Sequence, residues 1–268
     1  MADTDDQDQH ATQQSQKMPQ PQPRPFAQAV ELTIATYDQA ARNYAERNAE
    51  PRSAWTEQMA RFVDLLDEAR ARRPIPDLGR PGDDITLDEY LNFVPVLDAG
   101  CGPGRDARVL AAYGLPVLGV DLSQGMLDEA GERTARRLPT GFVRYALMDL
   151  RRLELPDASC RGVWAAASLL HLPKRVASRA MAELARVLRP GGPLALFLKR
   201  REGEQAEEEM QPYPFGEVTT APRFFAYYTP DEVRALVEGA GLEVLEQEVL
   251  PDGRPGAPSW VAILARKP

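Results

Sequence analysis

The strongest structural signal in this sequence is the stretch from Val94 to Leu122. A short apolar run ends at Asp98 and passes into a loop with glycine at positions 100, 102 and 104. After a helix-length interval, a second apolar run ends at Asp121. Short continuous apolar runs are typical of parallel strands buried on both faces. The pattern predicts a strand, a glycine loop that a ligand can approach, a helix and a second strand.

The loop has the chemistry of a nucleotide site. Its glycines lack Cβ, so a ligand can approach their backbone N–H groups closely. The segment 106–113 is predicted to be a helix whose positive N-terminal end faces that ligand. Asp121 follows the last glycine by about 17 residues, close to the roughly 20 that place an acid on ribose hydroxyls. A carboxylate suits a vicinal diol because it accepts both O–H hydrogen bonds.

The glycine spacing separates two kinds of cofactor. A dinucleotide fingerprint has its third glycine three residues after the second, but here Arg105 holds that position and Gly104 precedes it. The run from Val96 to Gly104, followed by Gly119 to Ser123, resembles motif I of the class I S-adenosylmethionine-dependent methyltransferases. We therefore favour this family over a nicotinamide oxidoreductase and over a glycine-rich turn that binds nothing.

The resemblance implies an α/β fold: a doubly wound, mostly parallel seven-stranded sheet with an N-terminal helical lid. It implies S-adenosyl-L-methionine as the cofactor. The residues expected to bind it lie in the glycine loop, at the strand ends and in the N-terminal helix: Asp98, Gly100, Cys101, Gly102, Gly104, Arg105, Asp121, Leu122, Met126, Asp149, Leu150, Ala167, Tyr37 and Tyr44. Two alternatives stay open: Asp149 as an ordinary loop aspartate, and Arg105 as a surface arginine.

Composition excludes several classes of protein. The chain has 268 residues, 43% of them hydrophobic, which allows one large α/β domain with appendages. Its net charge of −8 disfavours nucleic acid as the partner, because phosphate contacts need lysine and arginine. Two cysteines and two histidines, all scattered, make neither a disulfide framework nor a zinc site. We find no signal peptide and no apolar run of about 20 residues, so we expect a cytoplasmic protein without a membrane partner.

The chain divides into three parts. Residues 1–25 are polar and proline-rich, and we predict a disordered tail. Residues 26–92 are predicted to be a helical lid and linker, because Tyr37 to Tyr44 resembles a stretch that packs over the cofactor in this family. The alternative is that these helices only cap the sheet. Residues 93–268 are predicted to be the S-adenosylmethionine-binding domain, and they include an insertion at 200–227 on the substrate side. The aromatic end of that insertion either lines a substrate pocket or only packs.

The rest of the domain repeats strands and helices. Strands are predicted at 142–146, 162–167, 194–198, 242–250 and 260–266. The resemblance implies that the last two form an antiparallel pair at one sheet edge. Helices are predicted at 124–137, with Ser123 as its N-cap, and after Pro173. A third begins at Thr229, where an N-terminal capping pattern occurs.

The predicted reaction needs little acid–base chemistry from the protein. A methyl group on a sulfonium is already electrophilic, so the site must align it with a nucleophile and exclude water. His171 is the one histidine near the expected site and could serve as a general base or only shape the pocket. We expect a small-molecule acceptor. The alternatives are an RNA or protein acceptor, or a non-catalytic cofactor-binding protein. The sequence leaves open whether O, N, C or S is methylated, and it leaves the oligomeric state open.

Overall fold

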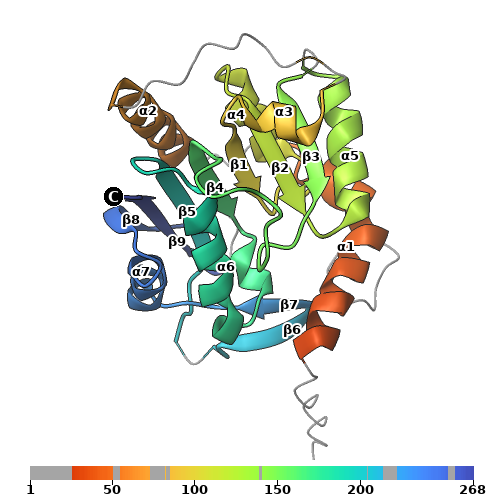
Figure 1. Cartoon of the computed structure of the whole chain (residues 1–268). Coiled ribbons are helices and arrows are strands. Elements are labelled where there is room, and N and C mark those ends of the chain that lie inside the picture. Colours follow the sequence, from red (N-terminus) through yellow and green to blue (C-terminus); the bar gives the residue numbers. More distant parts are fainter. Residues whose placement is uncertain are drawn as a thin grey trace, which may run out of the picture.

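A computed structural model gives the fold of residues 26–50, 55–72, 82, 85–138, 141–203, 205–213, 222–252 and 257–268 (Figure 1). The predicted disordered tail, 1–25, lies outside the described residues. In the described part of the chain, no helix has the length and apolar character needed to cross a membrane.

One sheet of seven strands forms the centre of the fold. Its order is β3-β2-β1-β4-β5-β9-β8. The first five strands are mutually parallel, whereas β9 runs antiparallel to both β5 and β8. The strands are β1 (Val96–Ala99), β2 (Val117–Asp121), β3 (Val143–Leu147), β4 (Gly162–Ala166), β5 (Pro193–Lys199), β8 (Glu243–Leu250) and β9 (Trp260–Arg266). The predicted sheet is confirmed, and its order reverses between β1 and β4, where open α/β sheets bind ligands.

Seven helices accompany the strands in the part of the chain that the structure describes. They are α1 (Phe26–Arg47), α2 (Thr56–Arg72), α3 (Leu87–Leu91), α4 (Arg105–Ala112), α5 (Gln124–Ala135), α6 (Lys174–Val187) and α7 (Pro230–Glu238). The predicted caps are confirmed: the Ser123 side chain accepts from the backbone N–H of Met126, and Thr229 forms a capping box with Glu232. These caps fix where α5 and α7 begin.

The region predicted as the N-terminal lid separates into two parts. In Figure 1, α1 and α2 lie at opposite sides of the molecule. The first helix, α1, packs against α5 and against the strand β7, whereas α2 packs against β5. Phe62 of α2 contacts the ring of Trp164 on β4, with ring centroids 5.5 Å apart. The two helices predicted to form the lid are therefore separate in space, and α2 packs on the central sheet.

A second, two-stranded sheet lies within the predicted insertion. It pairs β6 (Glu208–Pro212) with β7 (Pro222–Ala226) in antiparallel fashion. No strand was predicted from the sequence at these positions. Figure 1 shows them crossing between α1 and α6, and β7 contacts both α1 and the short 3₁₀ helix η2 (Leu169–His171). The insertion thereby reaches the segment that carries His171.

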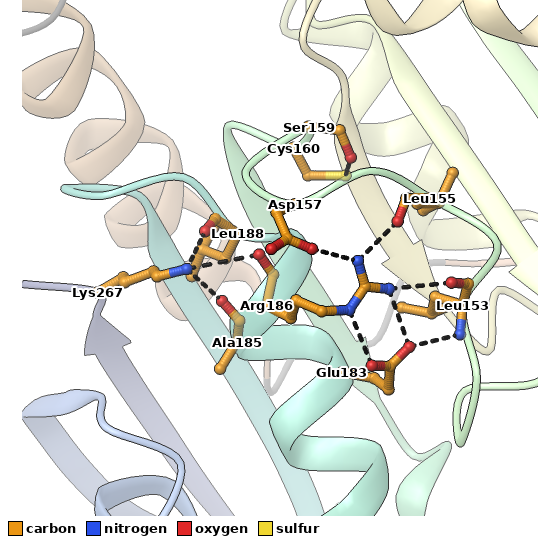
Figure 2. A network of polar contacts seen from close by, with 10 residues as sticks. All are labelled: Leu153, Leu155, Asp157, Ser159, Cys160, Glu183, Ala185, Arg186, Leu188 and Lys267. Atoms are coloured by element: carbon orange, nitrogen blue, oxygen red, sulfur yellow. Dashed lines mark hydrogen bonds and ion pairs between the residues drawn. The ribbon is translucent and has the colours of Figure 1, made fainter.

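The C-terminal end of α6 is held by a lysine from the other end of the chain. Lys267 Nζ lies 2.7 Å from the carbonyl oxygens of both Ala185 and Leu188 (Figure 2). The last carbonyls of a helix lack partners within the helix, and a cation satisfies them and the helix dipole together. This contact joins the segment that follows β9 to the segment that leads into β5.

The same helix end anchors the loop after β3. The guanidinium of Arg186 donates to the carbonyl oxygens of Leu153 and Leu155, at 3.0 and 2.7 Å (Figure 2). It also pairs with Glu183 at 2.8 Å and with Asp157 at 2.7 Å. Charge-assisted hydrogen bonds of this kind fix a loop that has no regular structure of its own.

Replacing Lys267 should destabilise the protein. In Lys267→Met, the carbonyls at the end of α6 lose their cationic donor, so the free energy of unfolding should fall by about 1–3 kcal/mol. Urea denaturation followed by circular dichroism measures this change. Arg234→Met removes an exposed ion pair on α7 and serves as a control, with an expected change below about 0.5 kcal/mol. Equal effects of the two substitutions would contradict the role given to Lys267.

Candidate functional site

A pocket opens at the carboxyl edge of the parallel strands, beneath α1. It holds about 1080 Å³ of empty space, part of it open to solvent. Its walls come from the loops after β1, β2, β3 and β4, and from one face of α1. Because the strands are parallel, their carboxyl ends lie at one edge of the sheet. Residues far apart in the sequence therefore come together at this edge.

The structure brings the predicted site residues together with one exception. Those that line the pocket are Tyr37, Tyr44, Asp98, Gly100, Cys101, Gly102, Arg105, Asp121, Leu122, Met126, Asp149, Leu150, Ala167 and His171. Gly104 is the exception, because it lies against the ring of Tyr145, where a Cβ would come within 2.2 Å of the phenol oxygen. Gly104 therefore allows close packing against Tyr145, and its part in cofactor binding stays a prediction.

Further residues line the pocket besides those predicted to bind the cofactor. They are Val30, Ile34, Asn48, Trp55, Pro103, Asp106, Met148, Ala166, Ser168 and Leu172. Val30 and Ile34 precede Tyr37 by seven and three positions, so helical periodicity could have placed all three on one face of α1. Trp55 carried no such signal, because its place depends on tertiary packing against Phe197 and Trp260.

Two close contacts shape the loop after β1. A Cβ on Gly100 would lie 2.2 Å from the Cβ of Ser168, so only glycine fits where the loops after β1 and β4 meet. Ala167 adopts a left-handed conformation with φ of 59°, which is uncommon outside glycine and turns the chain sharply after β4. The turn leads directly into Ser168 and the η2 segment.

The carboxylate of Asp121 is fixed at the end of β2. One oxygen accepts from the backbone N–H of Gly102 at 2.9 Å, and the other accepts from that of Ser123 at 2.9 Å. Burial raises the pKa of Asp121, while these backbone donors act in the opposite direction. The side chain is thus held rigidly at the pocket wall, and each oxygen retains a lone pair for a ligand.

Asp98 and Ser168 carry buried polar atoms without partners. Asp98 is 2% exposed, and neither its Oδ2 nor the Oγ of Ser168 has a hydrogen-bond partner. Burial raises the pKa of Asp98 well above its usual value, and the neighbouring carboxylate of Asp106 adds to the effect. Buried polar atoms are normally paired. Both atoms line the pocket, so a ligand with hydrogen-bond donors fits them.

Arg105 belongs to the pocket and not to the surface. Its side chain is 14% exposed and pairs with Asp106, with Nε 2.6 Å and Nη2 2.9 Å from the two carboxylate oxygens. Asp106 also accepts from the indole N–H of Trp164 at 3.1 Å. Arg105 is therefore not a solvated surface arginine, which was the alternative that the sequence left open. The carboxylate of Asp106 already neutralises part of the positive charge of Arg105.

Asp149 is likewise engaged by an arginine. Arg151 donates to both of its carboxylate oxygens, through Nε at 2.9 Å and Nη2 at 2.6 Å. Burial acts to raise the pKa of Asp149, but the hydrogen bonds from Arg151 outweigh it and lower the pKa. Asp149 is therefore an ionised acceptor at the pocket wall.

His171 faces α1 from the opposite wall. Its Nε2 lies 2.8 Å from the hydroxyl of Tyr37, and its Nδ1 lies 2.7 Å from the carbonyl oxygen of Phe224. The ring also packs edge-on against Phe225, with centroids 4.8 Å apart. Burial, reinforced by the charges of Arg223 and Lys199, lowers the pKa of His171 to about 3. The imidazole is therefore neutral at physiological pH.

Asp38 attaches α1 to the pocket. One of its carboxylate oxygens accepts from the Ser123 hydroxyl at 2.6 Å and from the backbone N–H of Gly125 at 3.0 Å. A Cβ on Gly125 would lie 2.9 Å from the carbonyl oxygen of Asp38, so α1 and α5 approach closely at this point. The lid helix is thus joined to the residue that holds Asp121.

Removing the Asp38 carboxylate should loosen α1. Asp38→Ala leaves the Ser123 hydroxyl and the Gly125 N–H without their charged acceptor, so the free energy of unfolding should fall by about 1–2 kcal/mol. Hydrogen exchange should increase in α1 and in the first turn of α5. Gln39→Ala, at the adjacent exposed position, is the control. Unchanged exchange in α1 of the Asp38 variant would show that this contact does not hold the helix.

Comparison with known proteins agrees with the fold. Residues 96–192 match the family model of a methyltransferase domain. Methyltransferase GfsG of Streptomyces halstedii is 36% identical over 169 residues, which cover 61% of this chain and 58% of that protein. The 27-O-demethylrifamycin SV methyltransferase of Amycolatopsis mediterranei is 33% identical over 181 residues, covering 64% and 61%. The chain spans about three fifths of the length of these curated relatives.

A solved structure extends the likeness to nearly the whole chain. It is that of the Burkholderia thailandensis 1,6-didemethyltoxoflavin-N1-methyltransferase with bound 1,6-didemethyltoxoflavin and S-adenosylhomocysteine. The TM-score is 0.64 at 18% identity, with 92% of both chains covered. At this identity the likeness concerns the fold alone, and it includes the N-terminal helices that the family model leaves out.

Proposed function

Because the chain belongs to the class I S-adenosylmethionine-dependent methyltransferases, we propose that it binds S-adenosylmethionine in this pocket and methylates a small molecule. The main observation behind the proposal is that Asp98, Asp121 and Asp149 line one pocket together with the glycine loop. These carboxylates lie at successive strand ends and offer acceptors to a cofactor that has an amine, a diol and an adenine amino group.

The pocket residues fit that cofactor. Asp121 would hold the ribose hydroxyls, since both of its oxygens are fixed and retain lone pairs. Asp149 would accept from the adenine amino group, beside Leu122, Met126 and Leu150. Asp98 would receive the amine of the methionyl end, because its buried Oδ2 lacks a partner. Gly100 and Gly102 leave space for a close backbone approach.

The cofactor, when bound, supplies an electrophilic methyl group. The protein's own contribution is to bind, to orient and to exclude water. The helix α1 covers the strand ends, with Asp38 fixing it to α5. Tyr37 and His171 face one another across the same pocket. Holding two reactants in line in a covered site removes much of the entropic barrier to transfer.

A small acceptor is favoured over RNA or protein. The lid helix and the β6–β7 sheet enclose the strand ends, which leaves little room for a macromolecule. Two of the proteins compared above have names that specify small molecules, a rifamycin and a toxoflavin precursor. The net charge of −8 also disfavours a polyanionic partner. We propose the cytoplasm as the place of action, since both cysteines are buried as free thiols.

Calorimetry with S-adenosylhomocysteine and with NAD tests the cofactor. We expect S-adenosylhomocysteine to bind and NAD not to bind. Asp121→Ala should weaken the binding by about 1–3 kcal/mol, because the ribose hydroxyls lose their acceptor. Asp128→Ala, an exposed carboxylate on α5, should leave the affinity unchanged. Binding of NAD alone, or an Asp121 variant with unchanged affinity, would contradict the proposal.

Cofactor binding should also release protons. In the free protein, burial raises the pKa of Asp98, which favours its protonated form. A bound amine cation favours the carboxylate and lowers that pKa, so affinity should rise as the pH rises through the pKa of free Asp98. Titrations in buffers of different ionisation enthalpy count the released protons. Asp98→Asn should abolish the release, and a wild-type protein that releases none would refute the pairing.

A further inference from the structure

Arg223 is a cation on the side of β7 that faces the pocket. Side chains alternate between the two faces of a strand, so Arg223 and Phe225 lie on the same face. Phe225 packs against His171 with ring centroids 4.8 Å apart, and Arg223 Nη1 donates to the hydroxyl of Tyr37 at 3.3 Å. His171 and Tyr37 both line the pocket. Arg223 therefore lies directly beside two residues of the pocket wall.

A chain of hydrogen bonds holds Tyr37 next to this arginine. It runs from the carbonyl oxygen of Phe224 through the ring of His171 to the hydroxyl of Tyr37, with contacts of 2.7 and 2.8 Å. None of these groups is an anion, because burial raises the pKa of Tyr37 and keeps its hydroxyl protonated. They give Arg223 one long hydrogen bond and no opposite charge.

The guanidinium of Arg223 is surrounded by aromatic rings. Its Cζ lies 5.0 Å from the ring centroids of Tyr213 and Phe225, and 5.7 Å from that of Tyr37. Ring faces attract a cation but do not replace the oxygen acceptors that its N–H groups need. Nε of Arg223 is buried without a hydrogen-bond partner, and no carboxylate of the described residues pairs with the side chain. Buried charges are normally paired, so a ligand that brings an anionic oxygen fits here.

Arg105, the other arginine of the site, shows the contrast. Both ends of its fork are taken by Asp106, with Nε 2.6 Å and Nη2 2.9 Å from the carboxylate oxygens. Arg223 has the same fork of donors and only the contact at Nη1. Lys199 adds a second positive charge nearby, 4.7 Å from the ring centroid of Phe225. A carboxylate matches a free guanidinium fork, because its two oxygens accept two parallel N–H hydrogen bonds.

We propose that Arg223 binds a carboxylate of the acceptor, so that the site selects acidic small molecules over their neutral analogues. This inference rests on the proposed function and narrows its substrate class. A carboxylate on Arg223 lies near Tyr37 and His171, and the charges of Asp98 and Asp121 at the strand ends repel it. The two effects together fix which end of the acceptor points away from the strand ends. Arg223 is thus a specificity-determining residue.

Binding to protein saturated with S-adenosylhomocysteine tests Arg223 without methyl transfer. The probes are aromatic and aliphatic carboxylic acids, each paired with its primary amide of the same shape, and NMR titrations give the Kd of each. We expect acids that bind about 10- to 100-fold more tightly than their amides. Arg223→Met should remove this preference, because methionine fills similar space without a charge. Arg42→Met, at an arginine on α1 whose side chain is 84% exposed, should keep it.

Two further results separate recognition from packing. Arg223→Lys keeps the charge but loses the planar fork, so we expect a reduced preference for acids. If Arg223 only held β7 against α1, Arg223→Met would weaken the binding of acids and amides alike. That result, or a wild type that binds no acid more tightly than its amide, would overturn the inference.

Methyl transfer gives a second readout. The probe is S-adenosylmethionine with a ¹³C-labelled methyl group, supplied with acid and amide pairs that also carry a hydroxyl or amino group. Arg223→Met should raise the KM of the acids by about 10- to 100-fold relative to that of the amides. Labelled products from amides alone would contradict the role of Arg223 while methyl transfer stands. Failure of the wild type to bind S-adenosylhomocysteine would reject the proposed function instead.

Discussion

The parallel pairing of β1 with β2 and with β4 is the constraint on which the site depends. Asp98 pairs in register with Gly119 on one side and with Trp164 on the other. The three strands therefore end at one edge, and their following loops must share that space. Only a residue without a side chain fits where two of these loops meet, which is why Gly100 lies against Ser168. The site is a consequence of how the sheet is wound.

The second determinant is the layer that covers this edge. The helix α1 comes from the start of the described chain and β7 from the insertion, yet both contact the segment that carries His171. Thr33 joins the two covers directly, because its hydroxyl accepts from the backbone N–H of Phe224 at 2.9 Å. Two segments far apart in the sequence thus cover the segment that carries His171.

The charges at the strand ends differ from those near His171. Carboxylates gather at the strand ends, where Oδ2 of Asp98 lacks a partner and Asp121 is held by backbone donors. Near His171 the charges are cations, Arg223 and Lys199, and both lie over the ring of Phe225. Carboxylates suit a cationic sulfonium compound, whereas burial, with these two cations, keeps the histidine neutral.

The sequence by itself determined the sheet, the glycine loop and the strand-end carboxylates, because apolar runs and glycine spacing are local signals. It left Arg105 open and gave no sign of the packing at Gly104, since neither the partner Asp106 nor the ring of Tyr145 can be read from spacing alone. Only the tertiary structure decided the β6–β7 sheet and the chain from Phe224 through His171 to Tyr37. Those contacts join residues separated by 53 and 134 positions, and no local pattern encodes which distant surfaces will pack together.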